Sequence, residues 1–227
     1  MAAPGASDMV VVVTGGDAID PANAREVPAG APVIAVDSGI EHAQRLDLPI
    51  HLAIGDFDSV DPLRLAQAEA AGATVERHPV AKDATDLELA LDAALALGPR
   101  RIHVLGGHGG RLDHLLGNLL VLAAPAYAAV TVTACMGRAR VTVVRAGAEL
   151  TGPRGDLVSL LPVHGGARGV TTHGLLYPLA GEDLPSGTTR GISNELVSAP
   201  ATVHLQDGVL VAVQPGELGT HHEELSR

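Results

Sequence analysis

Residues 50–62 read "IHLAIGDFDSVDP" and combine a buried strand with acidic residues at its end. The apolar lead-in, in which His51 is the only polar residue, is typical of a strand, and "SVDP" is typical of a turn before a new element. Asp56 and Asp58 therefore lie at the carboxyl end of a strand. An open α/β sheet binds its ligands at that edge, although a loop there also needs polar residues, so the pair alone leaves both interpretations open.

Composition limits the classes of function. A chain of 227 residues can bury one good core or divide into two modest domains. The formal net charge of −11 argues against a nucleic-acid or anionic-membrane partner and suits metal ions and cationic ligands. Cys135 is the only cysteine, which excludes an intrachain disulfide and a zinc cluster built from cysteines, fits a reducing compartment and favours a small buried core thiol.

Two apolar stretches resemble targeting or membrane segments only superficially. The N-terminal "MAAPGASDMVVVVTGGD" has no basic segment before its short apolar run, so it predicts a first strand rather than an export signal, and we expect a cytoplasmic protein. The stretch "LLVLAAPAYAAVTVTACM" is broken by Pro125 and changes from a Leu-rich helix to an alternating strand. It therefore predicts no membrane span.

The order of elements predicts two domains. Up to residue 137, the runs "VVVV", "VIAV", "HLAI", "RIHVL" and "VTVTA" alternate with helical runs such as "DPLRLAQAEAAG" and "TDLELALDAALALG", which predicts an α/β domain with a doubly wound parallel sheet. Residues 138–227 instead contain the short strands "ARVTVV", "DLVSLLPV", "GARGVTT" and "VHLQDGVLVAV", with Gly, Pro and Asp-Gly turns. They predict an all-β sandwich domain that ends in a polar tail, "GTHHEELSR".

Acidic residues follow three neighbouring strands. Asp37 follows "VIAV", Asp56 and Asp58 follow "HLAI", and Asp113 lies in the segment after "RIHVL". Four like charges on one rim repel one another unless cations bind there, so the pattern favours a metal site. Oxygen ligands without cysteine predict Mg²⁺ or Mn²⁺.

The loop "GGHGGR" follows a strand and precedes the helical "LDHLLGNLLVLAA". Its backbone amides and the helix N-terminus could hold phosphate, although it has neither the G-x-G-x-x-G spacing nor the terminal Gly-Lys-Ser/Thr of a P-loop. Arg111 would supply the positive charge, and His108 or His114 could reach phosphate. The alternative is a surface pair of Arg111 with Asp113, in which Asp113 caps the helix.

Two further segments stand out. In "KDATDLELAL", Thr85 and Glu88 fit a capping box and Asp86 suits the helix dipole, which leaves Lys82 and Asp83 unexplained. In "GISNEL", the cluster of Ser193, Asn194 and Glu195 could read the edge of a heterocycle, or it could be a polar turn before a strand "LVSA".

The ordered set "DSG", "GDFDS", "KDATDLELAL", "GGRLDHLLGN", "GLLYPL" and "GISNE" closely resembles the thiamine pyrophosphokinase family. The resemblance implies an α/β catalytic domain at 1–137 that binds ATP and Mg²⁺, and a β-sandwich domain at 138–227 that binds thiamine. It also implies a homodimer with its sites at the interface. The reaction would transfer pyrophosphate from ATP to the hydroxyethyl group of thiamine, giving thiamine diphosphate and AMP.

Matched by position, the resemblance implies roles for individual residues. The metal ligands would be Asp56, Asp58 and Asp86, and the catalytic set would add Arg111 and Asp113 to them. The nucleotide would contact Asp37, Asp83, Thr85, Gly109, Gly110, Arg111 and Asp113. Thiamine would contact Tyr177, Ser193 and Asn194. Two residues depart from the family. Ser38 stands where the family commonly has Gly, and Tyr177 stands where some members have Trp. A tyrosine can still stack on a cationic ring.

Three other functions compete with this interpretation. A pyrophosphokinase of another alcohol, such as a hydroxymethyl pterin, fits the "SNE" cluster less well. A metal-dependent glycosyltransferase would use an Asp-x-Asp pair but would not explain "GGRLDH" or the β-rich half. A non-catalytic thiamine or nucleotide sensor would keep the pocket and lose the metal ligands, which are all present here.

Overall fold

The computed structural model describes residues 7–216, and the chain divides into two compact units between Gly137 and Arg138. The first unit holds strands that alternate with helices, and the second holds strands only within its described part. The polar tail "GTHHEELSR" lies outside the described residues. Within residues 7–216, no helix has both the length and the apolar character of a membrane span.

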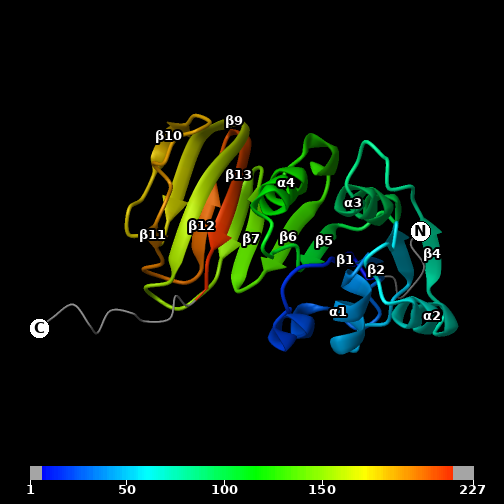
Figure 1. Ribbon diagram of the computed structural model, residues 1–227. Helices are drawn as coiled ribbons and strands as arrows, with labels where there is room; N and C mark the ends of the chain where they lie inside the picture. The colour runs from blue at the N-terminus through cyan, green and yellow to red at the C-terminus, as the bar shows by residue number, and fades with distance from the viewer. Residues whose placement is uncertain (1–6, 217–227) are drawn as a thin grey trace, which may run out of the picture. The chain divides into compact units, whose positions relative to one another are not determined.

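The sheet of the first unit consists of parallel strands (Figure 1). Their spatial order is β4 (Thr74–Arg77), β3 (Leu52–Gly55), β2 (Val33–Val36), β1 (Met9–Val13), β5 (Arg101–Leu105) and β6 (Thr131–Met136). Five of them coincide with the apolar runs that predict strands. The pattern does not predict β4, because its residues "TVER" at the edge of the sheet are mostly exposed and offer no apolar run.

Helices separate most of these strands along the chain. They are α1 (Gly39–Arg45), α2 (Pro62–Ala70), α3 (Asp86–Ala96) and α4 (Leu112–Leu122), with short 3₁₀ helices η1 (Pro21–Glu26) and η2 (Pro125–Tyr127). Figure 1 shows α3 and α4 on one side of the strands and α1 and α2 on the other. Polar N-cap side chains stabilise the N-termini of two helices. The Asp61 side chain accepts the Leu63 N–H before α2, and Thr85 Oγ1 accepts the Glu88 N–H at 3.2 Å before α3. The predicted cap at Thr85 is therefore confirmed.

The strand order reverses at β1, because β2 pairs with one of its edges and β5 with the other. The segments that follow β2 and β5 then diverge, with α1 and α4 on opposite sides of the strands in Figure 1, and a crevice opens at the carboxyl ends of the strands. Glycines let the backbones approach closely there. A Cβ on Gly39 would lie 2.1 Å from Val13 O, and one on Gly16 would lie 2.1 Å from His108 O. The first turn of α1 and the loops after β1 and β5 are therefore in backbone contact.

The second unit is antiparallel and is organised around one long strand. Strands β7 (Ala139–Val144), β13 (Asp207–Gln214), β9 (Leu157–His173), β12 (Ala201–His204) and β8 (Gly147–Leu150) are neighbours in this order, and β10 (Ala180–Leu184) and β11 (Asn194–Glu195) also pair with β9. A separate apolar core lies in this unit, with Leu160, Leu196 and Leu210 among its members. The described part of residues 138–216 contains no α-helix, as the sequence predicted.

The expectation of separate strands in "DLVSLLPV" and "GARGVTT" is wrong, because both belong to the 17-residue strand β9. His164, Gly165 and Gly166 have positive φ values of 50°, 109° and 106°, and the pairing register with β13 shifts beside them. The glycines therefore form a bulge within a continuous strand instead of a turn between two strands.

Two smaller expectations also fail in the second unit. The segment "LVSA" is not a strand; Asn194 and Glu195 themselves pair with β9, and Leu196 adds only a bridge to Leu175. The Asp207-Gly208 pair does not form the turn before β13, because it already belongs to that strand, and the turn lies at Leu205 and Gln206. In both places tertiary pairing outweighs the local turn preference.

The contact between α1 and β1 predicts opposite effects of one substitution at two helical glycines. Gly39→Ala should lower the free energy of unfolding by ~1–3 kcal/mol, because the new methyl group meets the Val13 carbonyl, which can move only with the strand. Gly117→Ala in α4 meets nothing within 4 Å and should raise stability by up to ~1 kcal/mol. Urea unfolding measures both. Equal effects of the two substitutions would contradict the close approach at Gly39.

Candidate active site

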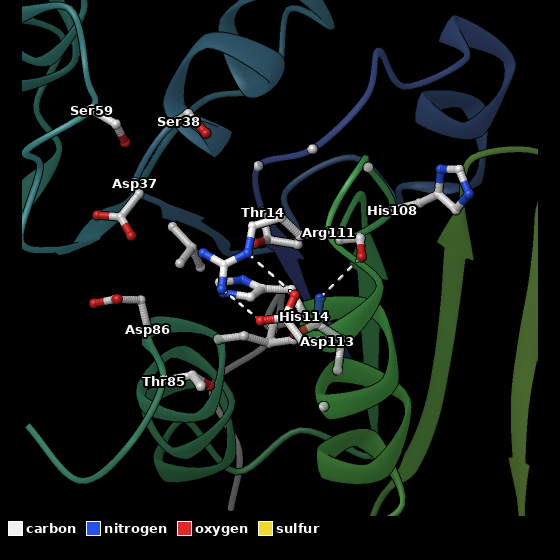
Figure 2. A pocket seen from close by; sticks show the side chains of 18 of the residues that line it. Thr14, Asp37, Ser38, Ser59, Thr85, Asp86, His108, Arg111, Asp113 and His114 are labelled. Atoms are coloured by element: carbon white, nitrogen blue, oxygen red, sulfur yellow. Dashed lines mark hydrogen bonds and ion pairs between the residues drawn. The ribbon is translucent and has the colours of Figure 1, made fainter.

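A cavity of about 580 Å³ opens in the first unit where the strand order reverses. It is lined by segments that follow β1, β2, β3 and β5 and by the segment that enters α3. Figure 2 shows Asp37 and Asp86 on one side of this cavity and Arg111, Asp113 and His114 on the other. The cavity therefore has an acidic side and a side that carries a glycine loop and an arginine.

Asp37 is held in place by the loop after β3. Its backbone has a positive φ of 45°, and its Oδ1 accepts the Phe57 N–H at 3.2 Å. A Cβ on Gly55 would lie 1.9 Å from the same oxygen, so glycine is required there to leave room for the carboxylate. Burial raises the pKa of Asp37 to about 6, and the neighbouring Asp86 and Asp56 carboxylates act in the same direction, against the Phe57 N–H and Lys82.

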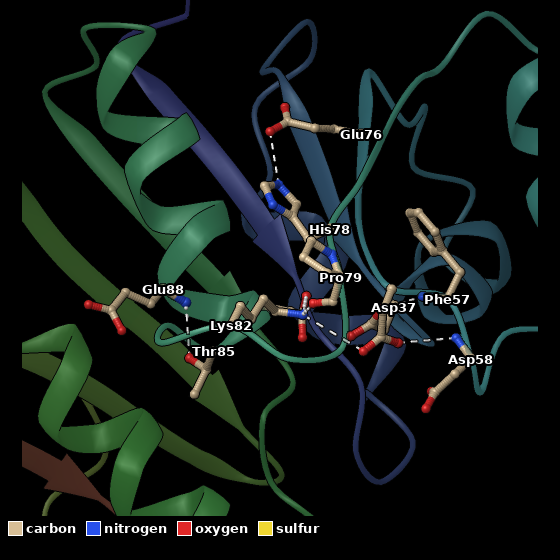
Figure 3. A network of polar contacts seen from close by, with 11 residues as sticks. Asp37, Phe57, Asp58, Glu76, His78, Pro79, Lys82, Thr85 and Glu88 are labelled. Atoms are coloured by element: carbon tan, nitrogen blue, oxygen red, sulfur yellow. Dashed lines mark hydrogen bonds and ion pairs between the residues drawn. The ribbon is translucent and has the colours of Figure 1, made fainter.

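Asp56 and Asp86 converge on the ammonium group of Lys82, whose surroundings are drawn in Figure 3. Lys82 Nζ lies 2.9 Å from Asp86 Oδ1 and 3.7 Å from Asp56 Oδ2. The three side chains are only 13–20% exposed. Burial lowers the pKa of Lys82, but the bond to Asp86 and the charges of Asp86, Asp56 and Asp37 outweigh it and raise the pKa overall. These carboxylates thus already hold one cation between them, so their oxygens suit Mg²⁺.

Asp58 and Asp83 are exposed and lie outside the cavity lining. The Asp58 N–H donates to Asp56 Oδ1 at 3.1 Å, and the Asp58 carboxylate lies apart from the Lys82 ammonium group in Figure 3. Phe57 between the two acids has a positive φ of 58°, an uncommon conformation for a bulky residue. Its ring is buried, with the Arg77 guanidinium 5.1 Å from the ring centroid, so it packs in the protein instead of lining the cavity.

The glycine loop joins the loop after β1. The Gly107 N–H donates to Gly15 O at 2.8 Å, and Asn118 Nδ2 of α4 donates to Gly107 O at 3.0 Å. Gly109 and Gly110 line the cavity just before α4. Amide groups of the loop and the N-terminus of α4 therefore surround this side of the cavity, which is an arrangement that favours anions.

Arg111 and Asp113 form an exposed ion pair, with Nη2 2.6 Å from Oδ2. Arg111 lowers the pKa of Asp113 to about 2. Asp113 lies in the first turn of α4 and is not its N-cap residue; Arg111 holds that position without a side-chain capping bond. The surface-pair alternative is thus correct about the pair and wrong about the cap. His114 lines the cavity, whereas His108 also contacts Asp17, with Nδ1 3.2 Å from Oδ2.

Sequence reasoning missed several lining residues. Thr14, Gly15 and Gly16 directly follow β1, and the signal was the sequence "TGG" after the first apolar run. The sequence pattern assigns no role to Lys82, which also lines the cavity. Ser38 also lines the cavity, and a Cβ on Gly15 would lie 2.2 Å from its Oγ, so Gly15 leaves the space that the Ser38 side chain fills.

In the second unit, Asn194 is tied to the backbone of Tyr177. Its Oδ1 accepts the N–H groups of Tyr177 and Glu195, both at 2.9 Å, and its Nδ2 donates to Tyr177 O at 2.7 Å. Asn194 is buried, whereas the Tyr177 residue is 58% exposed. Ser193 is exposed, and its N–H donates to Ser159 Oγ. Asn194 therefore fixes the segment that presents Tyr177.

The raised pKa of Asp37 predicts a pH-dependent stability of the metal-free protein. The unfolded carboxyl titrates near its usual value of about 3.9, so between about pH 4 and about pH 6 the folded state binds more protons and loses stability as the pH rises. Asp37→Asn keeps the acceptor for the Phe57 N–H and does not titrate. The free energy of unfolding of Asp37→Asn minus that of wild type, measured with urea in the presence of a chelator, should therefore increase from about pH 4 to about pH 6. If this difference in free energy of unfolding stays constant over that pH range, the pKa of Asp37 is not raised.

Comparisons with known proteins cover most of the chain. The family described as "Thiamin pyrophosphokinase, catalytic domain" matches residues 28–134, and "Thiamin pyrophosphokinase, vitamin B1 binding domain" matches residues 147–210. A thiamine pyrophosphokinase of Bacillus subtilis is 30% identical over 185 residues, which cover 80% of this chain and 82% of that protein.

Solved structures give the same result. The crystal structure of thiamine pyrophosphokinase from Bacillus subtilis has a TM-score of 0.82 and 27% identity, covering 92% of this chain and 100% of that chain. The enzyme from Geobacillus thermodenitrificans has a TM-score of 0.79 and 28% identity, covering 93% and 99%. Sequence and structure agree over most of the chain. This chain therefore belongs to the thiamine pyrophosphokinase family.

Proposed function

We propose that this chain transfers pyrophosphate from ATP to the hydroxyethyl group of thiamine, giving thiamine diphosphate and AMP. The observation that carries the proposal is the two-sided cavity of the first unit, in which carboxylates that share a cation face a glycine loop at a helix N-terminus. Such a cavity suits a metal-bound polyphosphate. The comparisons support none of the three alternatives, namely another pyrophosphokinase, a glycosyltransferase and a sensor.

The side formed by the glycine loop would bind the phosphates of ATP. Backbone amides around Gly109 and Gly110 and the N-terminus of α4 offer donors to anionic oxygens. The Arg111 side chain would turn from Asp113 to the polyphosphate. The nearby Asp113 carboxylate would limit the orientations that the Arg111 side chain can take. Thr85 and Asp37 lie on the opposite side, where they would contact the nucleotide.

Asp56 and Asp86 would hold Mg²⁺ on the acidic side of the cavity. When bound, this ion would supply positive charge to oxygens on which negative charge accumulates during transfer. Lys82 would move from the carboxylates toward the phosphates, whose negative charge would replace that of Asp86 and Asp56 in keeping the amine protonated. Asp58 as a ligand and Asp83 as a nucleotide contact stay predictions, since both are exposed outside the cavity.

The second unit would bind thiamine at the surface around Tyr177 and Ser193. The exposed tyrosine ring would stack on the cationic ring system. Asn194 uses both acceptor positions and one donor on protein backbone, so at most one N–H can reach a ligand. Its main role would be to position Tyr177. We also assign this unit to the β-sandwich class, and the first unit to the doubly wound parallel class.

A homodimer in the cytoplasm completes the proposal. Leu112, Leu116 and Leu120 form a stripe along α4 and are 68%, 53% and 48% exposed, which suits packing against a second copy. The stripe begins one residue after Arg111, so packing there would also shield the phosphate side from water. In this arrangement the catalytic unit of one chain and the thiamine-binding unit of the other would share a site.

The reaction itself tests the proposed activity. Purified protein with thiamine, ATP and Mg²⁺ should form thiamine diphosphate and AMP in equal amounts, whereas thiamine monophosphate with ADP would refute the assignment. Asp56→Asn should lower turnover by at least about a hundredfold, because the lost charge acts mainly in the transition state. Asp83→Asn, which removes an exposed carboxylate nearby, is the matched control for the loss of one charge and should lower turnover less. Equal losses of turnover in Asp56→Asn and Asp83→Asn would show that a position in the cavity lining does not make an acidic residue more important for the reaction.

Complementation tests the shared site. Asp56→Asn damages the catalytic unit, and Tyr177→Ala damages the thiamine-binding unit without removing a buried side chain. Equal co-expression makes about half the dimers mixed, and each has one site with both halves intact, so roughly a quarter of all sites should recover. If every chain builds its own site, activity stays at the average of the two variants.

A further inference from the structure

A second group of ligand-type side chains lies outside the cavity. Glu26, His103 and Cys135 offer a carboxylate oxygen, a ring nitrogen and a sulfur that lie within 4.8 Å of one another. None of the three lines the candidate active site. His103 and Cys135 are 4% and 3% exposed, and Glu26 is half-buried, so the group lies inside the first unit.

The strand register brings the group together. In the parallel pair β5 and β6, His103 lies opposite Thr133 and Leu105 opposite Cys135. Cys135 and Thr133 are two residues apart, so their side chains project from the same face of the sheet as His103. Glu26 is the last residue of η1, far from both strands in sequence. Three elements of the unit therefore meet at this point.

The imidazole of His103 is oriented by a neighbour. Its Nδ1 lies 2.8 Å from Thr133 Oγ1, a hydrogen bond that fixes the plane of the ring. Metal-bound histidines commonly use one ring nitrogen for such a bond and the other for the ion, so His103 would bind the ion through Nε2. Thr133 would therefore orient His103 for binding without contacting the ion itself.

The charges also suit a divalent ion. A thiolate and a carboxylate with a neutral imidazole carry two negative charges, which a divalent cation cancels, so the bound group is neutral overall at a buried position. A tetrahedral zinc site needs donor atoms about 3.3–3.6 Å apart, as bond lengths of about 2.0–2.3 Å imply. Donor atoms within 4.8 Å reach that spacing by side-chain adjustments of about 1 Å.

We propose that Glu26, His103 and Cys135 bind one Zn²⁺, with water as the fourth ligand. A thiolate and an imidazole select zinc over Mg²⁺, which prefers the oxygen ligands of the active site. The Cys135 thiol gives up its proton to solvent on binding, so affinity increases with pH. The single cysteine excludes a cluster of cysteines but not this mixed set. The ion would fasten η1 to β5 and β6 and would have a structural role that does not depend on the proposed reaction.

Metal content after loading tests the site. The full chain is incubated with Zn²⁺, a phosphine reductant and excess Mg²⁺, then desalted and analysed for zinc. We expect about one Zn²⁺ per chain for wild type and for Asp56→Asn, which changes only the oxygen-ligand site, and less than about a tenth for Cys135→Ala and Glu26→Gln. Thr133→Val should weaken zinc affinity by about 10–100-fold, because it frees the imidazole ring to rotate.

Cobalt identifies the ligands directly. Co²⁺ loaded in place of Zn²⁺ should give a thiolate-to-metal charge-transfer band that persists in Asp56→Asn and disappears in Cys135→Ala. If Cys135→Ala does not fold, Glu26→Gln, which changes the half-buried member, supplies the same comparison of zinc content. Wild type without retained zinc, equal zinc in wild type and Glu26→Gln, or a cobalt complex without the thiolate band would each overturn the proposal.

Discussion

The reversal of strand order at β1 is the constraint on which the rest of the first unit depends. β2 and β5 pair with opposite edges of β1, so the segments that follow β2 and β5 must diverge. A crevice results between these segments without any special side chain. The crevice stays narrow because Gly16, Gly39 and Gly106 let neighbouring backbones come into direct contact. Substituents on these residues would force the loops apart. Backbone geometry therefore defines the cavity before any polar group contributes to it.

The sequence predicted most of the fold because burial leaves a clear pattern. Strands of a parallel sheet are covered on both faces, so they appear as apolar runs, and five of the six strands of the first unit were recognised in this way. The edge strand β4 lacks this signal because it is mostly exposed. In the second unit, glycines marked real irregularities, but local composition cannot distinguish a bulge inside β9 from a turn between two strands.

The site was predicted less completely, for a physical reason. Strand ends locate carboxylates at an edge, which was enough to group Asp37 with Asp56, whereas Asp86 at the start of α3 was added by the resemblance to the family. Strand ends do not specify side-chain direction. Asp58 is two residues from Asp56 and is still exposed outside the cavity, after Phe57, whose φ is positive. Asn194 shows the same limit: its carboxamide could read a heterocycle, yet the fold uses it to hold Tyr177.

Lys82 would affect how the acidic side of the cavity binds the proposed Mg²⁺. An ammonium group between Asp56 and Asp86 acts as a built-in counterion, so an arriving divalent cation must displace a charge that is already well placed. The net gain from binding a bare ion is smaller than for two unpaired carboxylates. A polyphosphate changes this competition, because it offers the displaced ammonium a new anionic partner. Under the proposed function, ion and nucleotide would therefore bind cooperatively, and Lys82 would return to Asp56 and Asp86 when the product leaves.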